Sequence, residues 1–566
     1  TVRELHGHFI RTNRHKNPNA MSQVIESYAR SPPSIDKARF AFSEIEAPTL
    51  ALCNHMIRGL SRSDTPADAL HVFDKMCVTG LRIDNITLIF ITKACGRVTD
   101  VSFGRRVHTR VLKLGFGSYL YVCNALIHMY GCCADFRSSR RIFDEMDEKD
   151  LVSWNSMICA YSHCERYEDV LAVFQMMRAA ENTKPDAVTM VKVIFACSFL
   201  GESELIDRFV EYIDDNSIEM DVYLGNTLID VFGNRGRLEM ARGFFDRITE
   251  KNSVSWNAML IAYAKSGDFV RARKVFDEMP CRDVVSWTSM ITGFVQANRP
   301  DDAIAVFLEM TTGSSEVGPD RVTLTAVLSA CARTGRLDVG KTVHDTVRRT
   351  IANPDVYVLN ALIDMYCKCG SVGEAMAVFR GTEAKKDPVT WTCIISGLAV
   401  NGDPENAFRL FSRMSLLGVK PAHGTFVAVI LACVHSGDVD RGLAFFRSME
   451  KDHGLVPEMK HYGAVVDLMC RAGYLERAHD FIAGMPVDPD PALWTMLLGG
   501  CRLHGDLVLS GIAMEKLRGS EESKRVSGYV LSSNSYASAG KWDDATRMRE
   551  EFREFEIKPS GWSCLQ

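Results

Sequence analysis

The sequence predicts an all-α fold, a right-handed α-solenoid superhelix built from helix-turn-helix repeats. Three observations predict it. Near-identical segments recur about every 31 to 37 residues, apolar residues inside each interval follow helical spacing, and no stretch alternates apolar and polar residues long enough to require a sheet. A fixed period in this range is typical of a solenoid, in which each repeat packs only against its neighbours.

The repeats are visible as recurring strings. Four tryptophans lie in the contexts LVSWNSMI (151–158), SVSWNAML (253–260), VVSWTSMI (284–291) and PVTWTCII (388–395). A cysteine also recurs at one slot, as Cys95, Cys197, Cys331 and Cys433. Aligning these series divides the chain into units that begin near 18, 50, 85, 120, 151, 187, 222, 253, 284, 321, 356, 388, 423 and 459.

Each unit has the pattern of a helical hairpin. In 284–320 an apolar stripe at helical spacing precedes a polar break at 298–300, and a second stripe follows it with Ala303, Val306, Phe307 and Met310. The second stripe recurs near 69–76, 272–279 and 407–414. One hairpin cannot bury both of its faces, so we expect neighbouring hairpins to stack into a continuous core.

Composition excludes several classes of protein. The 566 residues carry a formal net charge of −5, without a basic tail, and no apolar run approaches the roughly 20 residues that cross a membrane. None of the 18 cysteines has C-x-x-C spacing, so we expect reduced, buried thiols, no metal site and no cofactor. The chain opens at Thr1 without an initiator methionine, so we expect any targeting segment to lie outside this sequence.

The repeats resemble the pentatricopeptide-repeat (PPR) family, in particular the plant organellar PLS subclass, which mixes standard (P), long (L) and short (S) motifs. The SWN-MI strings and VFDEMP (275–280) carry the resemblance, and PALWTMLLGGCRLHGD (491–506) with 529–551 resembles the paired E motifs of RNA-editing factors. The resemblance implies three regions: 1–17 as the remnant of an N-terminal repeat, 18–490 as about fourteen motifs, and 491–566 as E-type helical motifs. A tetratricopeptide scaffold shares the hairpin but would need a W-x-x-L-G-x-x-Y first helix, which these units lack.

Polar side chains recur at two slots of the units. The fifth residues include Asn54, Asn124, Asn155, Asn226, Asn257, Thr288, Thr325, Asn360 and Thr392, and the residues just before the next unit include Asp84, Asp150, Asp186, Asn252, Asp283, Asp320, Asp355 and Asp387. Asparagine offers a donor and an acceptor, threonine a hydroxyl, and aspartate only acceptors. Such a base-reading pair in each repeat can match the edge of one unstacked base of single-stranded RNA.

A structural role is the alternative for each of these residues. An aspartate before a helix is commonly a turn former or N-cap, and Ser153, Ser255, Ser286 and Thr390 could cap the same helices. Capping alone does not explain the L units, which begin at 85, 187, 321 and 423. Two of them keep the aspartate, as Asp221 and Asp355, while the fifth residue is mostly apolar, as in Ile89, Val191 and Val427.

The resemblance also implies a target. Asn/Asp pairs resemble the combination that prefers uracil, Thr288/Asp320 and Thr325/Asp355 resemble guanine readers, and Asn226/Asn252 resembles a cytosine reader. The units from 50 to 387 therefore imply the RNA 5′-U-x-U-U-x-C/U-U-G-G/x-U-3′. Thr392 is followed by Ala422 instead of aspartate, which departs from the family's pattern.

Side chains at the second position of the unit are implied to sandwich bases. These are Val152, Val254, Val285, Val322 and Val389, with Tyr121, Tyr223 and Tyr357 in short units. Packing at the start of the helix is the alternative. Because the net charge is negative, we expect RNA affinity to depend on local basic residues and on salt concentration. Arg105, Arg106, Arg110, Lys113, Arg348 and Arg349 are candidates, with a solvated helix face as the alternative.

The sequence matches one enzyme motif and part of a second. Gly335, Gly340, Lys341 and Thr342 match the phosphate-loop pattern, but they fall between the two predicted helices of one unit, where no strand precedes them. A zinc deaminase needs H-x-E with P-C-x-x-C, and the chain has only His163-Cys164-Glu165 and no C-x-x-C. We therefore expect no catalytic residues and no enzyme activity, with chemistry supplied by another polypeptide or by a segment beyond Gln566.

These observations lead to one functional hypothesis and two alternatives. We expect an RNA-binding factor for organellar C-to-U editing, whose partners are single-stranded organellar RNA, a deaminase-bearing protein acting in trans and other editing cofactors, with no membrane. The first alternative is a factor for transcript processing, stabilisation or splicing, and the second is a protein-binding helical scaffold. The resemblance implies a mitochondrion or chloroplast, with the mitochondrion slightly favoured, although no residue distinguishes the two.

Overall fold

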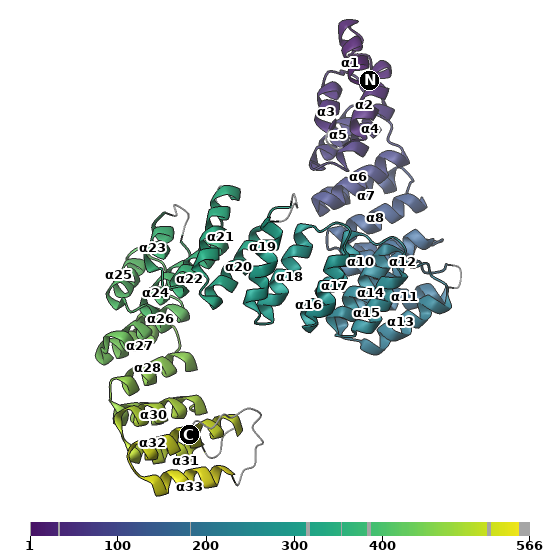
Figure 1. Ribbon diagram of the computed structural model, residues 1–566. Coiled ribbons are helices and arrows are strands. Elements are labelled where there is room, and N and C mark those ends of the chain that lie inside the picture. The colour runs from purple at the N-terminus through teal and green to yellow at the C-terminus, as the bar shows by residue number, and fades with distance from the viewer. Residues whose placement is uncertain are drawn as a thin grey trace. The chain divides into compact units, whose positions relative to one another are not determined.

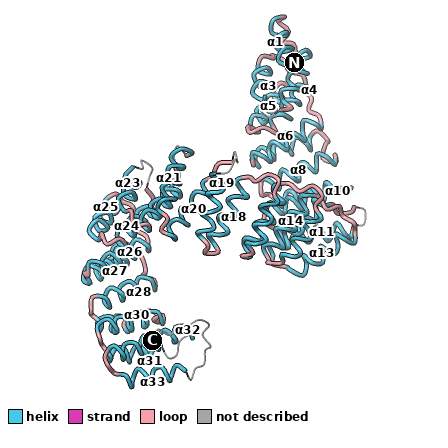
Figure 2. The backbone as a smooth tube through the Cα atoms, viewed as in Figure 1, coloured by secondary structure: helices cyan, strands magenta, loops and turns pink. Residues whose placement is uncertain are grey.

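The computed structural model describes residues 2–31, 34–180, 183–312, 317–351, 354–381, 386–517 and 522–553. Across these ranges it contains 33 helices and no strand (Figure 2). The predicted all-α class is therefore confirmed. The chain divides into two compact units, Thr1–Met279 and Pro280–Gln566, and each is described by itself.

The first compact unit contains seventeen of the described helices. They are α1 (Val2–Arg11), α2 (Pro18–Ala29), α3 (Ile35–Ser43), α4 (Leu50–Leu60), α5 (Ala67–Val78), α6 (Asn85–Val98), α7 (Val101–Lys113), α8 (Leu120–Cys132), α9 (Phe136–Glu145), α10 (Leu151–His163), α11 (Tyr167–Ala179), α12 (Ala187–Leu200), α13 (Ser203–Asp215), α14 (Val222–Asn234), α15 (Leu238–Arg247), α16 (Ser253–Ser266) and α17 (Phe269–Glu278).

The second compact unit contains the other sixteen. They are α18 (Val284–Gln296), α19 (Pro300–Thr312), α20 (Arg321–Thr334), α21 (Leu337–Thr350), α22 (Val356–Lys368), α23 (Val372–Gly381), α24 (Pro388–Val400), α25 (Pro404–Leu416), α26 (His423–Ser436), α27 (Val439–His453), α28 (Met459–Arg471), α29 (Leu475–Ala483), α30 (Pro491–His504), α31 (Leu507–Leu517), α32 (Glu522–Ser538) and α33 (Trp542–Arg553).

Helices pair into hairpins along both compact units (Figure 1). The fourteen hairpins from α2/α3 to α28/α29 begin at the residues where the repeat pattern divides the sequence, and α30/α31 and α32/α33 follow them. Inside each compact unit the first helix of a hairpin packs on the first helix of the next, as α6 does on α8 and α8 on α10. Each compact unit is therefore a stack in which each hairpin contacts its neighbours.

The apolar stripes of the second helices form the core between hairpins. In α19, Ala303 and Phe307 are fully buried and Met310 is 2% exposed. Phe143, Phe174 and Phe276 are fully buried in other second helices. Burying one such side chain stabilises the fold by about 1.5–3 kcal/mol, so the recurring phenylalanine contributes substantially in each repeat.

Small residues set the spacing between neighbouring first helices. A Cβ added to Gly131 of α8 would lie 2.5 Å from the Cβ and 2.6 Å from the Cα of Ala160 in α10. Gly233 of α14 and Ala262 of α16 repeat this approach, with 2.5 Å between the added Cβ and the alanine Cβ. Only glycine allows two helix backbones to come this close.

The recurring cysteines belong to the core. Cys95, Cys197, Cys331 and Cys433 are fully buried and form no disulfide. Burial raises the pKa of each thiol to about 12. Protonated thiols of this kind are unreactive, as expected for structural cysteines. None of the described helices is both long enough and apolar enough to cross a membrane.

Candidate nucleic-acid interface

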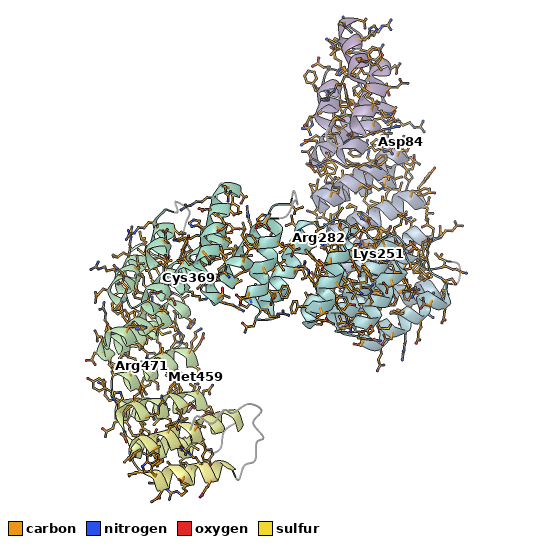
Figure 3. All side chains as sticks on the ribbon, viewed as in Figure 1. Asp84, Lys251, Arg282, Cys369, Met459 and Arg471 are labelled. Atoms are coloured by element: carbon orange, nitrogen blue, oxygen red, sulfur yellow. The ribbon has the colours of Figure 1, made fainter. Side chains whose placement is uncertain are left out.

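The aspartates that precede the units are N-caps of the first helices. The side chain of Asp84, labelled in Figure 3, accepts a hydrogen bond of 2.8 Å from the backbone N–H of Thr87 at the start of α6. Asp150 accepts one of 2.8 Å from Ser153, and that serine hydroxyl also accepts from the Asp150 N–H. The structural interpretation of these aspartates is therefore correct, with the serine as the reciprocal member of the cap.

The same carboxylates also meet the fifth residue of the preceding repeat. The amide Nδ2 of Asn54 donates to both carboxylate oxygens of Asp84 at 3.2 Å. Asn124 Nδ2 donates to Asp150 at 3.2 Å. The remaining contacts join Asn155 to Asp186 at 3.1 Å, Asn226 to Asn252 at 3.4 Å, Thr288 to Asp320 at 3.5 Å, and Asn360 to Asp387. Residues 26 to 32 positions apart thus form one polar pair at each of these junctions.

These pairs keep hydrogen-bonding capacity for a ligand. In Asp150 and Asp186 the described hydrogen bonds all fall on Oδ1, which leaves Oδ2 as an acceptor. Each asparagine amide has a second N–H beyond the one that donates to the aspartate. A donor beside a charged acceptor complements uracil, which presents the O4 acceptor next to the N3–H donor.

The carboxylates are held in the charged form. Burial acts to raise the pKa of Asp150, but hydrogen bonds from Ser153 and Asn124 outweigh it, so the pKa lies below its usual value. The pKa of Asp84 is lowered against burial in the same way, by Thr87 and Asn54. An ionised acceptor is available at these junctions at neutral pH.

The second-position side chains are exposed. Val152, Val254, Val285, Val322 and Val389 are 52–57% exposed, and Tyr121, Tyr223 and Tyr357 are 69–80% exposed. They are therefore not part of the core at the start of the helix, contrary to the packing alternative. Val152 precedes Asn155 by three residues in α10, which puts both side chains on one face of the helix.

The structure does not bring together every predicted pair. The hydroxyl of Thr325 donates to the carbonyls of Arg321 and Val322 in its own helix, and Asp355 pairs with Arg321 at 3.1 Å. Asn257 and Asp283 belong to different compact units, so this pair remains a prediction. Thr392 has no aspartate before the next unit, and its hydroxyl lies 2.7 Å from that of Thr425.

Several basic candidates are engaged with carboxylates. Arg105 pairs with Asp135 at 3.0 Å, Arg106 with Asp74 at 3.6 Å, and Arg348 with Asp345 at 3.9 Å. The arginine side chains are 65–67% exposed, as expected for a solvated face.

The phosphate-loop match is a coincidence of helical repeats. Gly335 ends α20 in the left-handed conformation, with φ of +71°, and Gly340, Lys341 and Thr342 lie inside α21. Their backbone N–H groups follow a helix and do not form a phosphate cradle. The recurring histidines are also structural, because His108 and His344 hydrogen-bond the hydroxyls of Tyr130 and Tyr366 at 3.0 and 2.8 Å.

One histidine cluster has the spacing of metal ligands. His423, Glu458 and His461 place their ligand atoms within 4.8 Å of one another. However, Nδ1 of His461 accepts from the Glu458 N–H at 2.9 Å, and its Nε2 donates to the His423 carbonyl at 3.0 Å. His461 thus occupies the slot of the capping serine in other units, with both ring nitrogens in use.

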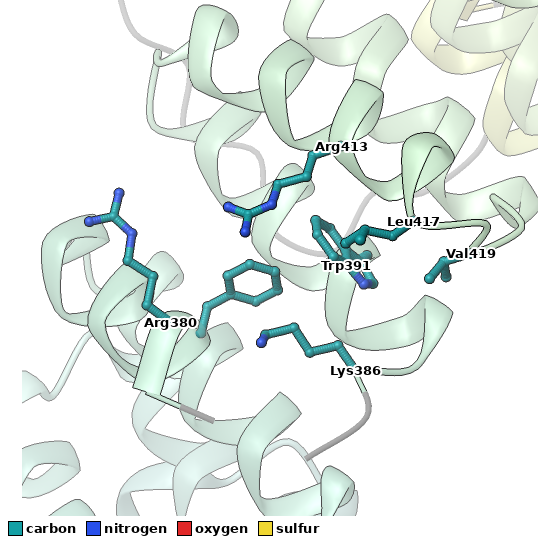
Figure 4. Close-up of a pocket in the computed structure, with 7 residues that line it drawn as sticks. Arg380, Lys386, Trp391, Arg413, Leu417 and Val419 are labelled. Atoms are coloured by element: carbon teal, nitrogen blue, oxygen red, sulfur yellow. The ribbon is translucent and has the colours of Figure 1, made fainter. Parts of the chain in front are cut away.

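A cavity of about 590 Å³ lies beside α23, α24 and α25 and is lined by Phe379, Lys386 and Trp391 (Figure 4). The rings of Phe379 and Trp391 meet edge to face at 5.0 Å, and the Lys386 ammonium lies 5.0 Å from the Phe379 ring centre. The same phenylalanine, tryptophan and lysine cluster recurs at Phe143, Trp154 and Lys149. It is therefore a packing feature of the repeat.

The sequence interpretation missed one set of residues at the interface. Thr87, Thr189, Thr323 and Thr425 lie at the third position of the four L units, and their hydroxyls contact the fifth residue of the preceding unit. The signal was present, because threonine recurs at this slot in all four L units.

Comparisons with known proteins agree with the hairpin geometry. Models of the PPR repeat match residues 51–81, 121–151, 152–181, 226–253, 254–284, 352–381 and 424–453, and a model of the PPR repeat family matches 282–333 and 386–435. A mitochondrial pentatricopeptide repeat-containing protein of Arabidopsis thaliana is 40% identical over 97% of this chain and 81% of its own length. The chain belongs to the pentatricopeptide-repeat family.

Other comparisons place this PPR protein among plant relatives and within a solenoid fold. A second pentatricopeptide repeat-containing protein of Arabidopsis thaliana is 33% identical over the whole of this chain and 96% of its own length. The crystal structure of maize PPR10 matches with a TM-score of 0.58 and 17% identity, over 95% of this chain and 84% of PPR10. The predicted α-solenoid fold of the PPR protein is therefore confirmed.

Proposed function

We propose that this PPR protein is a sequence-specific single-stranded RNA-binding factor for C-to-U editing in a plant organelle. The repeats of 18–490, assigned to the P, L and S types, bind the RNA, and 491–566, assigned to E motifs, recruits a deaminase in trans. The protein itself does not perform the catalysis.

The observation that carries the proposal is the pairing of the fifth residue with the capping aspartate of the next repeat. The contacts at Asn54/Asp84, Asn124/Asp150 and Asn155/Asp186 repeat one geometry in the first compact unit. Each pair offers an N–H to uracil O4 and a carboxylate oxygen to uracil N3–H. An exposed valine or tyrosine at the second position supplies an apolar surface for the face of the base.

The relatives support an organellar RNA-binding role. Their names include a mitochondrial and a chloroplastic pentatricopeptide repeat-containing protein, and PPR10 has been solved in complex with an 18-nucleotide psaJ RNA element. The chemistry of the base-reading pairs favours the same class of ligand here.

Fluorescence anisotropy with the RNA 5′-U-x-U-U-x-C/U-U-G-G/x-U-3′ tests the binding proposal. We expect the matched RNA to bind at least about tenfold more tightly than one in which cytosines replace the uracils, because cytosine N3 carries no proton and leaves the charged acceptor unmatched at each replaced base. Affinity should fall as salt concentration rises. Equal binding of the two RNAs would contradict the proposal.

Organelle RNA sequencing of a loss-of-function plant tests the role in editing. Loss of one or a few cytidine conversions, with the target cytidine a few nucleotides 3′ of the bound element, is the expected result. Altered transcript ends or retained introns, with all conversions intact, would instead indicate a processing or splicing factor.

A further inference from the structure

The four L units each place a buried hydroxyl against the base-reading residue of the preceding repeat. Thr87 Oγ1 lies 2.6 Å from Asn54 Oδ1, and Thr189 Oγ1 lies 2.6 Å from Asn155 Oδ1. The hydroxyls of Thr323 and Thr425 lie 2.6 and 2.7 Å from those of Thr288 and Thr392. All four L-unit threonines are fully buried.

Base-reading asparagines that precede other unit types lack this contact. The Oδ1 atoms of Asn124, Asn226 and Asn360 are buried and accept no hydrogen bond from a described residue. At the junction after Asn124, the Ser153 hydroxyl donates to Asp150 Oδ1 at 2.7 Å and accepts from the Asp150 N–H, so its described hydrogen bonds are with Asp150. The hydroxyl contact with the fifth residue is therefore present where the next unit is an L unit and absent, among the described residues, at these three junctions.

The contact fixes which end of the amide faces the ligand. A half-turn of an asparagine side chain exchanges its oxygen for its NH2 group. Both ends of the Asn54 amide are engaged, because Nδ2 donates to Asp84 and Oδ1 accepts from the Thr87 hydroxyl. The Thr87 hydroxyl also lies 2.7 Å from Asp84 Oδ1, so its one proton is shared between the two acceptors. The second N–H of Nδ2 remains for a base.

A fixed N–H discriminates between the two pyrimidines. Uracil presents an acceptor at O4 and matches the N–H, whereas cytosine presents an amino donor at the same place. Asn124 lacks a donor on Oδ1, so its amide can turn toward a cytosine amino group at the cost of its bond to Asp150 alone. The same turn at Asn54 also breaks the contact with Thr87.

We infer that the third-position threonines of the L units are positioning residues, which fix the base-reading side chain of the preceding repeat. Where that side chain is Asn54 or Asn155, they sharpen its choice between uracil and cytosine. This inference rests on the proposed RNA-binding function. It gives the L units, whose own fifth residues are mostly apolar, a part in specificity.

Thr87→Val tests the inference, because valine keeps the shape of threonine and removes the hydroxyl. The measured quantity is the ratio of Kd for an RNA with cytosine to Kd for one with uracil opposite the unit that begins at 50. We expect this ratio to fall about fivefold, the usual effect of one hydrogen bond, while binding of the uracil RNA changes less than about threefold. Thr87→Ser should retain the wild-type ratio.

Two controls separate positioning from general destabilisation. In Thr87→Val the ratio opposite the unit that begins at 151 should stay at its wild-type value. Ser153→Ala removes a hydroxyl at the equivalent slot that does not reach Asn124, so the ratio opposite the unit that begins at 120 should not change. Thr189→Val repeats the test with Asn155 in case Thr87→Val does not fold.

An unchanged ratio in Thr87→Val and Thr189→Val would overturn the inference, as would an equal fall in Thr87→Ser. These outcomes leave the proposed function intact. A wild-type protein without preference for uracil opposite the units at 50 and 151 would instead overturn the proposed function and, with it, the inference.

Discussion

At the scale of single residues, Asp150 is a helix cap and also half of a proposed base-reading pair. Its Oδ1 accepts from the Ser153 N–H and from Asn124, while Oδ2 remains for a ligand. Asparagine caps helices as well as aspartate does, so Asp150→Asn should change stability by less than about 0.5 kcal/mol. An amide at this place can donate to cytosine N3. The Asn124 amide, whose buried Oδ1 has no hydrogen-bond donor to hold it, can turn so that this oxygen accepts from the cytosine amino group.

We therefore expect Asp150→Asn to change the preferred base opposite the unit that begins at 120 from uracil to cytosine, by about tenfold in relative Kd. Anisotropy with two RNAs that differ at this nucleotide measures the change. Asp135→Asn is the matched control, since Asp135 caps α9 through the Ser138 N–H at 3.2 Å but belongs to no base-reading pair. If both variants or neither changed preference, Asp150 would not be a base-reading residue.

At the scale of helices, Gly131 controls how closely α8 approaches α10. An alanine Cβ there would lie 2.6 Å from the Cα of Ala160, and a backbone atom cannot move aside as a side chain can. We expect Gly131→Ala to destabilise the first compact unit by about 1–3 kcal/mol, the usual cost of overpacking. Thermal unfolding followed by circular dichroism should show a lower first transition.

Gly243→Ala in α15 is the control for this prediction. An added Cβ on Gly243 meets no atom within 4 Å. Alanine favours a helix over glycine by about 1 kcal/mol, so this variant should be as stable as the wild type or more stable. Equal stability of the Gly131 and Gly243 variants would show that the close approach of α8 and α10 is not a constraint.

Helix starts were predictable because they depend on local chemistry. Asp84, Asp150 and Asp320 cap helices that begin one residue later, so a recurring aspartate marks the boundary directly. Contacts between repeats were only partly predictable. The hydroxyl of Thr87 acts on Asn54, 33 residues away, and the pairing of Asp355 with Arg321 spans 34 residues. The sequence also did not decide whether Val152 is buried or exposed, because valine is common both in the core and on the surface.

At the scale of the whole chain, hairpins that pack on their neighbours within each compact unit predict that one repeat can be removed by itself. In the described part of the chain, the hairpin α14/α15 (222–252) packs on the neighbouring hairpins, with α12 and α16 on either side of α14. Asp221 now caps α14 by accepting from the Leu224 N–H at 2.7 Å. Deleting 222–252 joins Asp221 to Ser253, so that Asp221 would precede Ser255 by three residues. Asn252, which caps α16 by accepting from the Ser255 N–H, has this spacing now. The helix cap is thus rebuilt at the new junction.

If each repeat binds one nucleotide, this deletion should shorten the target by one. We expect the variant to prefer an RNA that lacks the C/U nucleotide assigned to Asn226 and Asn252, by about tenfold over the full-length target, while the wild-type protein keeps the opposite preference. Anisotropy with both RNAs and both proteins measures this exchange, and circular dichroism verifies that the variant is folded. If each repeat binds one nucleotide, removing one hairpin shifts every later repeat by one nucleotide along the RNA. A folded variant that still preferred the full-length RNA would therefore show that repeats and nucleotides do not correspond one to one.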